Sequence, residues 1–269
     1  MSDRVRQVVV AIGAAAAIIG AAWGSGAFGG TPIEDAADGA LAADATLVAP
    51  ASTAFSIWSV IYTGLALLAI VQALPSRASS PRYRSVAWWA LASMILNVAW
   101  IAVVQAGWLW LSVLVLLAIV AVLLGAARRL GAAQDRNLLD LAATDVTVGL
   151  YLGWSIVASA ANLAAVLDVQ QRGVAILLIA AVVAVSMTLV FRLASRPAAV
   201  SVALAVAWGV MWIGFGRLDD PHSTPVAVTA FVAAALAAAA AVWRFTRDRS
   251  SSGIRATAAS ARKKVNAAL

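Results

Sequence analysis

The 269-residue sequence contains no cysteine and only 12% charged residues. Without cysteine the chain forms no disulfide bond and offers no thiolate to a metal ion. Hydrophobic residues make up 63% of the sequence, and the remaining polar residues are too few to cover a soluble protein of this length. The composition therefore indicates an integral membrane protein.

The residue combinations that carry most enzyme chemistry are also missing from the sequence. It shows no set of serine, histidine and acid, no acid pair, no glycine-rich phosphate loop and no cluster of metal ligands. The single histidine, His222, stands beside Asp219 and Asp220, but a stable metal site needs more ligands, and a solvated loop is the simpler interpretation. We expect no enzyme activity, no metal site and no required cofactor.

Uncharged runs long enough to cross a membrane recur along the sequence. A helix needs about 20 residues to span a hydrocarbon core of about 30 Å. The sequence therefore predicts an all-α integral membrane protein, a helical bundle of about eight transmembrane helices. These helices are expected at Val5–Trp23, Thr53–Ala73, Val86–Ala106, Leu109–Ala127, Leu141–Val166, Gly173–Phe191, Ala198–Phe215 and Val226–Trp243.

Basic residues collect on one side of this topology. If the amino terminus is cytoplasmic, 17 of the 19 lysine and arginine residues lie in inner segments, and only Arg172 and Arg217 lie outside. Lysine and arginine in short loops resist translocation, so the pattern predicts a cell-membrane protein with both termini in the cytoplasm. The net charge of +7 follows from this topology and from attraction to anionic lipid, and it requires no nucleic acid partner. The inner basic residues are Arg4, Arg6, Arg77, Arg82, Arg84, Arg128, Arg129, Arg136, Arg192, Arg196, Arg244, Arg247, Arg249, Arg255, Arg262, Lys263 and Lys264.

The two ends of the chain allow more than one interpretation. Arg4 and Arg6 precede an apolar run that ends in small residues, as in a signal peptide, but the run is longer than a signal peptide needs and we favour a retained helix. For the basic cytoplasmic tail, residues 244–269, we expect disorder. Between the helices only the outer loop, residues 24–52, is long, so function must lie in the bundle or in this loop.

Aromatic and polar residues recur at helical spacing in three of the predicted helices. Phe55, Trp58 and Tyr62 are separated by three, four and seven residues and share one face of a helix. Asn97 and Trp100 share a face of the next helix in the same way. The third face carries Tyr151, Ser155, Ala158 and Asn162, with Trp154 beside it.

Polar side chains are costly in hydrocarbon, so Asn97 and Asn162 should face the inside of the bundle. Their amides either join helices by hydrogen bonds or contact a ligand, and the sequence leaves both roles open. Five tryptophans that lie deep or on these faces predict an outward-opening aromatic pocket for a flat apolar ligand. They are Trp58, Trp100, Trp154, Trp208 and Trp212.

Asp145 lies about one turn inside the cytoplasmic end of its predicted helix. An acid at this depth either reaches toward the lipid headgroups or pairs with a partner inside the bundle. We favour a structural role, because a proton-coupled carrier places its ionisable groups deeper in the membrane.

The same faces carry a resemblance to the TspO/MBR family, the tryptophan-rich sensory or translocator proteins. The family's pattern of proline, phenylalanine and Trp-x-x-x-Tyr is similar to APASTAFSIWSVIY, and its Leu-Asn-x-x-Trp pattern is similar to LNVAW. Its Tyr-x-x-Trp pattern with a later alanine and asparagine resembles YLGWSIVASAAN, and the resemblance covers about Val5 to Val166. The matching residues are Pro50, Phe55, Trp58, Tyr62, Leu96, Asn97, Trp100, Tyr151, Trp154, Ala158 and Asn162.

The resemblance implies a five-helix core, residues 1–166, that binds a porphyrin, haem or sterol-like molecule between the outer loop and the helices and often forms a homodimer. Residues 167–243 would then add three transmembrane helices to that core. The chain departs from the family pattern at Pro50, which stands alone where the family has paired prolines, and at Leu150, where the family has proline. The ligand-binding residues that the resemblance implies are Phe55, Trp58, Tyr62, Asn97, Trp100, Tyr151, Trp154, Ala158 and Asn162.

We therefore expect a multi-pass membrane receptor or carrier whose partners are the lipid bilayer and a flat apolar ligand, a tetrapyrrole or a sterol-like molecule. A secondary transporter of a small solute is the alternative, and it predicts internal sequence symmetry and broken helices. The sequence shows only a weak similarity between two of its segments, SVAWWALASMILNVAW and SVALAVAWGVMWIGF, and no proline inside a predicted helix. A structural membrane subunit without a ligand is the third interpretation.

The predicted topology can be tested with single cysteines introduced into this cysteine-free chain. An impermeant maleimide should modify Asp38→Cys in intact cells, and it should modify Ser251→Cys only after the membrane is permeabilised. The reason is that the distribution of basic residues places these two positions on opposite sides of the membrane. Equal labelling of both variants in intact cells would contradict this topology.

Overall fold

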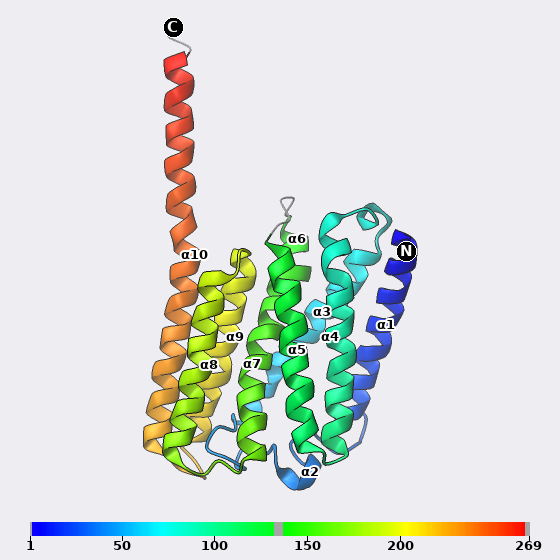
Figure 1. The fold of residues 1–269 in the computed structure, drawn as a ribbon, viewed down its shortest axis with the longest axis vertical. Coiled ribbons are helices and arrows are strands. Elements are labelled where there is room, and N and C mark those ends of the chain that lie inside the picture. Colours follow the sequence, from blue (N-terminus) through cyan, green and yellow to red (C-terminus); the bar gives the residue numbers. More distant parts are fainter. Residues whose placement is uncertain (1, 132–136, 267–269) are drawn as a thin grey trace.

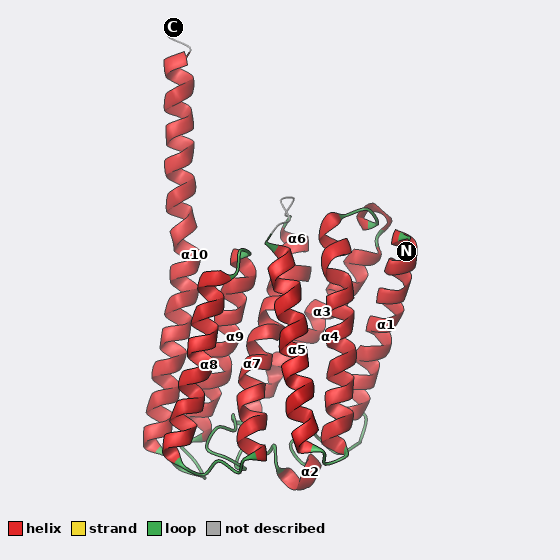
Figure 2. Cartoon of the chain, viewed as in Figure 1, coloured by secondary structure: helices red, strands yellow, loops and turns green. Residues whose placement is uncertain are grey.

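The structure is a computed structural model that describes residues 2–131 and 137–266, which form helices joined by loops (Figure 1, Figure 2). Arg136, counted above among the inner basic residues, lies outside the described residues. In the described ranges, eight helical segments are long and apolar enough to cross a membrane, which confirms the predicted all-α membrane bundle. Their elements are α1 (Asp3–Gly24), η1 (Ser52–Ser56) with α3 (Ile57–Ala73), α4 (Pro81–Gln105), α5 (Leu109–Leu130), α7 (Thr147–Val166), α8 (Arg172–Arg192), α9 (Arg196–Gly216) and α10 (Thr224–Asn266).

Four short elements complete the described structure. α2 (Ala36–Gly39) lies in the outer loop, and η2 (Pro75–Arg77) connects α3 to α4. The helical turn α6 (Leu138–Asp140) runs into the π-helical turn η3 (Leu141–Val146), which continues directly into α7.

The spans stand side by side, with α2 at one end of the bundle and the amino terminus and α6 at the other (Figure 1). α7 occupies the middle of the bundle and contacts α3, α5, α8 and α9. α4 packs between α5 and α1, while α8 and α10 both pack against α9. The predicted inner segments therefore share the end of the bundle that holds the amino terminus.

Glycines determine the contact between α7 and α9. A Cβ added at Gly153 would come within 2.5 Å of the carbonyl oxygen of Val202 in α9, and one at Gly149 would collide with the Ala198 carbonyl. The two glycines are four residues apart and share one helix face, a spacing that lets membrane helices approach backbone to backbone. This contact joins the first five spans to the last three.

Polar contacts fix α1 against α3. Gln7 donates from Nε2 to the carbonyl oxygens of Gln72 and Leu74, both at 2.8 Å, and Gln72 Nε2 donates to the Gln7 carbonyl at 2.9 Å. Both glutamines are buried. Because hydrogen bonds of this kind set the register of neighbouring membrane helices, α1 packs against α3 in a defined register.

The expectation of a disordered tail is wrong, because α10 continues as a helix from its membrane span to Asn266. Figure 1 shows this helix extending beyond the other spans. Alanine, arginine and lysine are strong helix formers, and no proline follows Pro225. The span supplies the costly helix nucleus, from which the helix continues.

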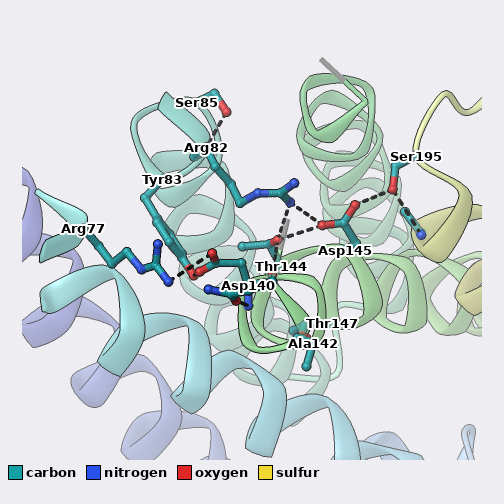
Figure 3. Close-up of polar contacts among 12 residues, drawn as sticks. Arg77, Arg82, Tyr83, Ser85, Asp140, Ala142, Thr144, Asp145, Thr147 and Ser195 are labelled. Carbon is teal, nitrogen blue, oxygen red and sulfur yellow. Dashed lines mark hydrogen bonds and ion pairs between the residues drawn. The ribbon is translucent and has the colours of Figure 1, made fainter. Parts of the chain in front are cut away.

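Asp145 lies inside the bundle and not among the headgroups. Its carboxylate is buried and accepts hydrogen bonds from the Arg82 guanidinium and from the Thr144 and Ser195 hydroxyls (Figure 3). Arg82 also donates to the Thr144 hydroxyl at 2.9 Å. This settles the two alternatives for Asp145 in favour of pairing within the bundle. Arg82, counted among the inner basic residues, is a buried side chain in the first turn of α4.

A second polar pair lies beside the first at the same end of the bundle. Asp140 of α6 accepts a hydrogen bond from the Tyr83 hydroxyl at 2.8 Å and forms an ion pair with Arg77 at 3.2 Å (Figure 3). The turn η3, which separates Asp140 from α7, is a π-helical segment, a rare geometry that is common at functional positions. The two pairs together tie η2, α4 and the start of α9 to the segment that leads into α7.

Removal of one partner of the buried ion pair should destabilise the bundle. Asp145→Ala leaves the Arg82 guanidinium without its carboxylate, and breaking a buried pair in this way costs about 3–5 kcal/mol. We expect a clear fall in the melting temperature of the purified protein in detergent. The double variant Arg82→Met with Asp145→Leu should recover most of the loss, because no unpaired charge remains. Equal destabilisation of the single and the double variant would show that the charges are not the cause.

Candidate functional site

An aromatic cluster centred on Trp58 joins α3 to α7. The Trp58 ring stacks on Tyr62 with a centroid distance of 5.2 Å, and it forms T-shaped contacts with Tyr151 at 5.6 Å and Trp154 at 6.3 Å. Phe55 meets Trp154 in the same T-shaped manner at 5.7 Å. These are the favoured geometries of aromatic pairs. The aromatic face of α3 is therefore a packing surface, and its rings have fixed positions.

Asn97 and Asn162 are both paired inside the bundle. Asn97 donates from Nδ2 to the Tyr62 hydroxyl at 2.9 Å, which links α4 to α3. Asn162 donates from Nδ2 to the Ser112 hydroxyl at 2.5 Å, which links α7 to α5. The two residues are 3% and 2% exposed. Each amide thus has an interhelical role, the first of the two alternatives that the sequence left open.

A narrow cavity lies between the aromatic cluster and the outer loop. Its volume is about 40 Å³, which is room for water but far below the roughly 300–1,000 Å³ of pockets that hold organic ligands. The structure brings eight of the nine predicted ligand-binding residues to its walls. These are Phe55, Trp58, Asn97, Trp100, Tyr151, Trp154, Ala158 and Asn162.

A larger cavity of about 300 Å³ adjoins the narrow one. Tyr62, the ninth predicted residue, lines this larger cavity together with Glu34 and Ser52 of the outer loop. Because the two cavities have five wall residues in common, we treat them as one site and call them the aromatic site. The shared residues are Ile33, Phe55, Trp58, Asn97 and Trp100.

Two tryptophans of the aromatic site present hydrogen-bond donors without a partner. Trp100 Nε1 and Trp154 Nε1 are buried and form no hydrogen bond within the described part of the chain. The two residues are 7% and 2% exposed. A buried donor without an acceptor costs about 1–3 kcal/mol. These indole groups are therefore suited to meet an acceptor atom of a bound molecule.

The outer loop closes the aromatic site at the end of the bundle that holds α2. Its first part is fixed to α4, because Gln105 Nε2 donates to the carbonyl oxygens of Gly24 at 2.9 Å and Thr31 at 2.8 Å. Its later part, residues 40–50, forms a wall of the narrow cavity, and we call it the roof segment. The roof residues that line the cavity are Ala40, Leu41, Thr46, Ala49 and Pro50.

Trp208 and Trp212 do not line either cavity, so the predicted pocket of five tryptophans is wrong at these two positions. Trp208 Nε1 donates to the Ala54 carbonyl at 2.9 Å. Trp212 packs against Trp208 and Phe215 with centroid distances of 5.6 Å and 5.2 Å. α9 contacts η1 and α7, and neither ring reaches the cavities at this junction.

Some wall residues were not among the predicted binding residues. Leu116 and Ile119 reach the narrow cavity from α5, whose 109–127 stretch is almost entirely apolar and gives no face that spacing could select. Ser155 of α7 also lines the cavity. Its position on the Tyr151 face was visible in the sequence, but a single serine hydroxyl carries little specificity.

Comparison with known proteins identifies the family of the chain. The family profile described as TSPO-like protein matches residues 7–243. No curated protein and no solved structure matches the chain. The matched region extends beyond the resemblance seen in the sequence, which ended near Val166, and it includes α8, α9 and the start of α10. The chain therefore belongs to the TSPO-like protein family and is a multi-pass membrane protein of that type.

Proposed function

We propose that the protein is a receptor or carrier that binds a flat apolar molecule in the aromatic site. The observation that carries the proposal is a buried aromatic wall with two unpartnered indole donors, those of Trp100 and Trp154. The ligand class is a tetrapyrrole or a sterol-like molecule that bears a hydrogen-bond acceptor. Membership of the TSPO-like family supports the same assignment.

The chemistry of the walls defines what such a ligand must offer. An aromatic ligand that stacks on an indole ring gains about 0.5–1.5 kcal/mol per pair beyond the burial of its surface. A carboxylate or carbonyl oxygen of the ligand would accept a hydrogen bond from Trp100 or Trp154, where water is scarce and the bond is correspondingly strong. A porphyrin combines a flat apolar ring with carboxylates and meets both conditions. A purely apolar molecule would leave the two donors unpaired.

We also propose that the aromatic site opens toward the outside of the cell membrane. The outer loop, which contains α2, supplies walls of the site. α2 lies at the end of the bundle opposite the amino terminus (Figure 1). The rule that basic segments remain in the cytoplasm assigns the α2 end to the outside. A ligand then reaches the site from the external medium or from the outer leaflet, and the protein acts on it without chemical conversion.

Changes at Trp154 should weaken ligand binding in a graded way. Trp154→Phe keeps most of the aromatic area but removes the N–H donor, so the affinity for protoporphyrin should fall about two- to tenfold, the range for one hydrogen bond. Trp154→Ala should weaken binding further, because it also leaves a void that the ligand does not fill. Absorbance and tryptophan-quenching titrations of the purified protein with protoporphyrin, haem and sterols measure these effects.

Trp212→Phe is the matched control for this series. The Trp212 indole nitrogen is also buried without a partner, but the residue lines neither cavity. Its replacement should leave the affinity for protoporphyrin unchanged. If the unmodified protein, shown to be folded by circular dichroism, binds no tetrapyrrole and no sterol, the proposed function is wrong and the small-solute carrier becomes the leading interpretation.

Asn162→Leu separates helix packing from ligand contact. The hydrogen bond from Asn162 to Ser112 joins α7 to α5, and an interhelical bond of this kind is worth about 1 kcal/mol. If the amide serves only helix packing, the melting temperature should fall and the affinity for protoporphyrin should stay unchanged. A loss of affinity in a variant that still folds would instead place the amide in contact with the ligand.

A further inference from the structure

The roof segment is held over the aromatic site by residues that follow α7 in the chain. Arg217, at the end of α9, donates from Nη1 to the Thr46 carbonyl oxygen and from Nη2 to the Ala43 carbonyl oxygen at 2.6 Å. The Leu47 N–H donates to the Val169 carbonyl at 3.3 Å. Thr46 itself lines the narrow cavity, so the guanidinium of Arg217 contacts the backbone of a cavity wall.

Neighbouring contacts come from the same part of the chain. Gln170 Nε2 donates to the Ala45 carbonyl at 2.9 Å, and the Ala51 N–H donates to the Trp212 carbonyl at 3.1 Å. These partners belong to the α7–α8 connection and to α9. The first five spans thus supply the helical walls of the aromatic site, while residues 169–217 hold its roof.

Arg217 is fully buried although it lies just beyond the end of a membrane span. Burial lowers the pKa of its guanidinium, and the charges of Asp44 and Asp220 act in the opposite direction. A buried cation requires polar partners, and the roof carbonyl oxygens of Ala43 and Thr46 provide them. The closed roof and the buried position of Arg217 therefore stabilise each other.

With the roof in this position, the narrow cavity beneath it has a volume of about 40 Å³, whereas organic ligands occupy roughly 300–1,000 Å³. The adjoining cavity of about 300 Å³ has no wall residue from the roof segment. A ligand that is to reach Trp154, which lines only the narrow cavity, therefore requires the roof to move. The start of the roof adjoins Ala37, Asp38 and Gly39, which all have positive φ, a conformation that is strained for the two residues other than glycine.

We propose that Arg217 is a positioning residue that fastens the roof segment over the narrow cavity of the aromatic site and so limits access to that cavity. The last three spans then control entry to a cavity whose helical walls are built by the first five. The identity of the ligand in this scheme rests on the proposed function. The closure of the roof does not, and it can be measured without any ligand.

Labelling of a single cysteine beneath the roof tests this proposal. Thr46→Cys places a thiol at a wall position that is 3% exposed, and it leaves the Thr46 carbonyl available to Arg217. A maleimide should react with this thiol at least about tenfold faster when Arg217→Met is added, since the loss of a charged hydrogen bond changes an equilibrium by that much or more. Arg217→Lys keeps the charge but cannot donate from two guanidinium nitrogens to the two carbonyl oxygens, and it should give an intermediate labelling rate.

Arg172→Met is the matched control, because Arg172 is an exposed arginine on the same side of the bundle. It should leave the labelling rate at Thr46→Cys unchanged. If folded Arg217→Met and Arg217→Lys proteins both label at the rate of the parent, the proposal is overturned. If Arg217→Met does not fold, Arg217→Lys decides alone, and an unchanged rate again overturns the proposal.

Binding kinetics then separate this inference from the proposed function. Stopped-flow tryptophan quenching with protoporphyrin should show faster association and faster dissociation in Arg217→Met, with a smaller change in affinity than in either rate. A merely structural role of Arg217 would instead lower the amount of competent protein without changing the rates, and that result counts against the proposal. Accelerated labelling in a protein that binds no tetrapyrrole would support the fastened roof and reject the tetrapyrrole ligand.

Discussion

Polar side chains inside the bundle must find partners there, because the surrounding hydrocarbon offers none. This constraint organises the structure around α7 and the turn that precedes it. Asp145 pairs with Arg82 of α4 and with Ser195 at the start of α9, and Asn162 pairs with Ser112 of α5. Each pairing sets one neighbouring helix against α7. The helices that form the walls of the aromatic site are positioned by these contacts.

The aromatic site combines two kinds of wall that differ in how they are held. Its helical walls consist of rings that contact one another, as Trp58 does with Tyr62, Tyr151 and Trp154, and close packing of this kind resists displacement. Its roof is a loop held mainly by hydrogen bonds to backbone carbonyl oxygens, among them those from Arg217. If the cavity enlarges, we therefore expect the roof to move and the aromatic rings to keep their positions.

The last three spans are integral to this arrangement. α9 packs against α7 through Gly149 and Gly153 at a distance that no larger side chain would permit. The same helix is followed directly by Arg217, whose guanidinium reaches the loop between α1 and α3. The TSPO-like family match likewise extends through this part of the chain. α9 thus packs against α7 and also places Arg217 where it anchors the outer loop.

The sequence by itself determined the eight spans, since membrane thickness sets how long an apolar helix must be. It also placed Trp58, Asn97 and Trp154 on inward faces, because helical spacing alone decides which residues share a face. It did not show that Trp58 lines the cavity and Trp212 does not. Helical periodicity groups residues on one face, but it does not say which neighbouring helix that face contacts. The sequence singled out Arg217 only as one of two basic residues on the outer side and did not reveal its partners, because Thr46 and Ala43 lie 171 and 174 residues away along the chain. Only the tertiary structure decides such contacts, which depend on helix rotation and on the path of the outer loop.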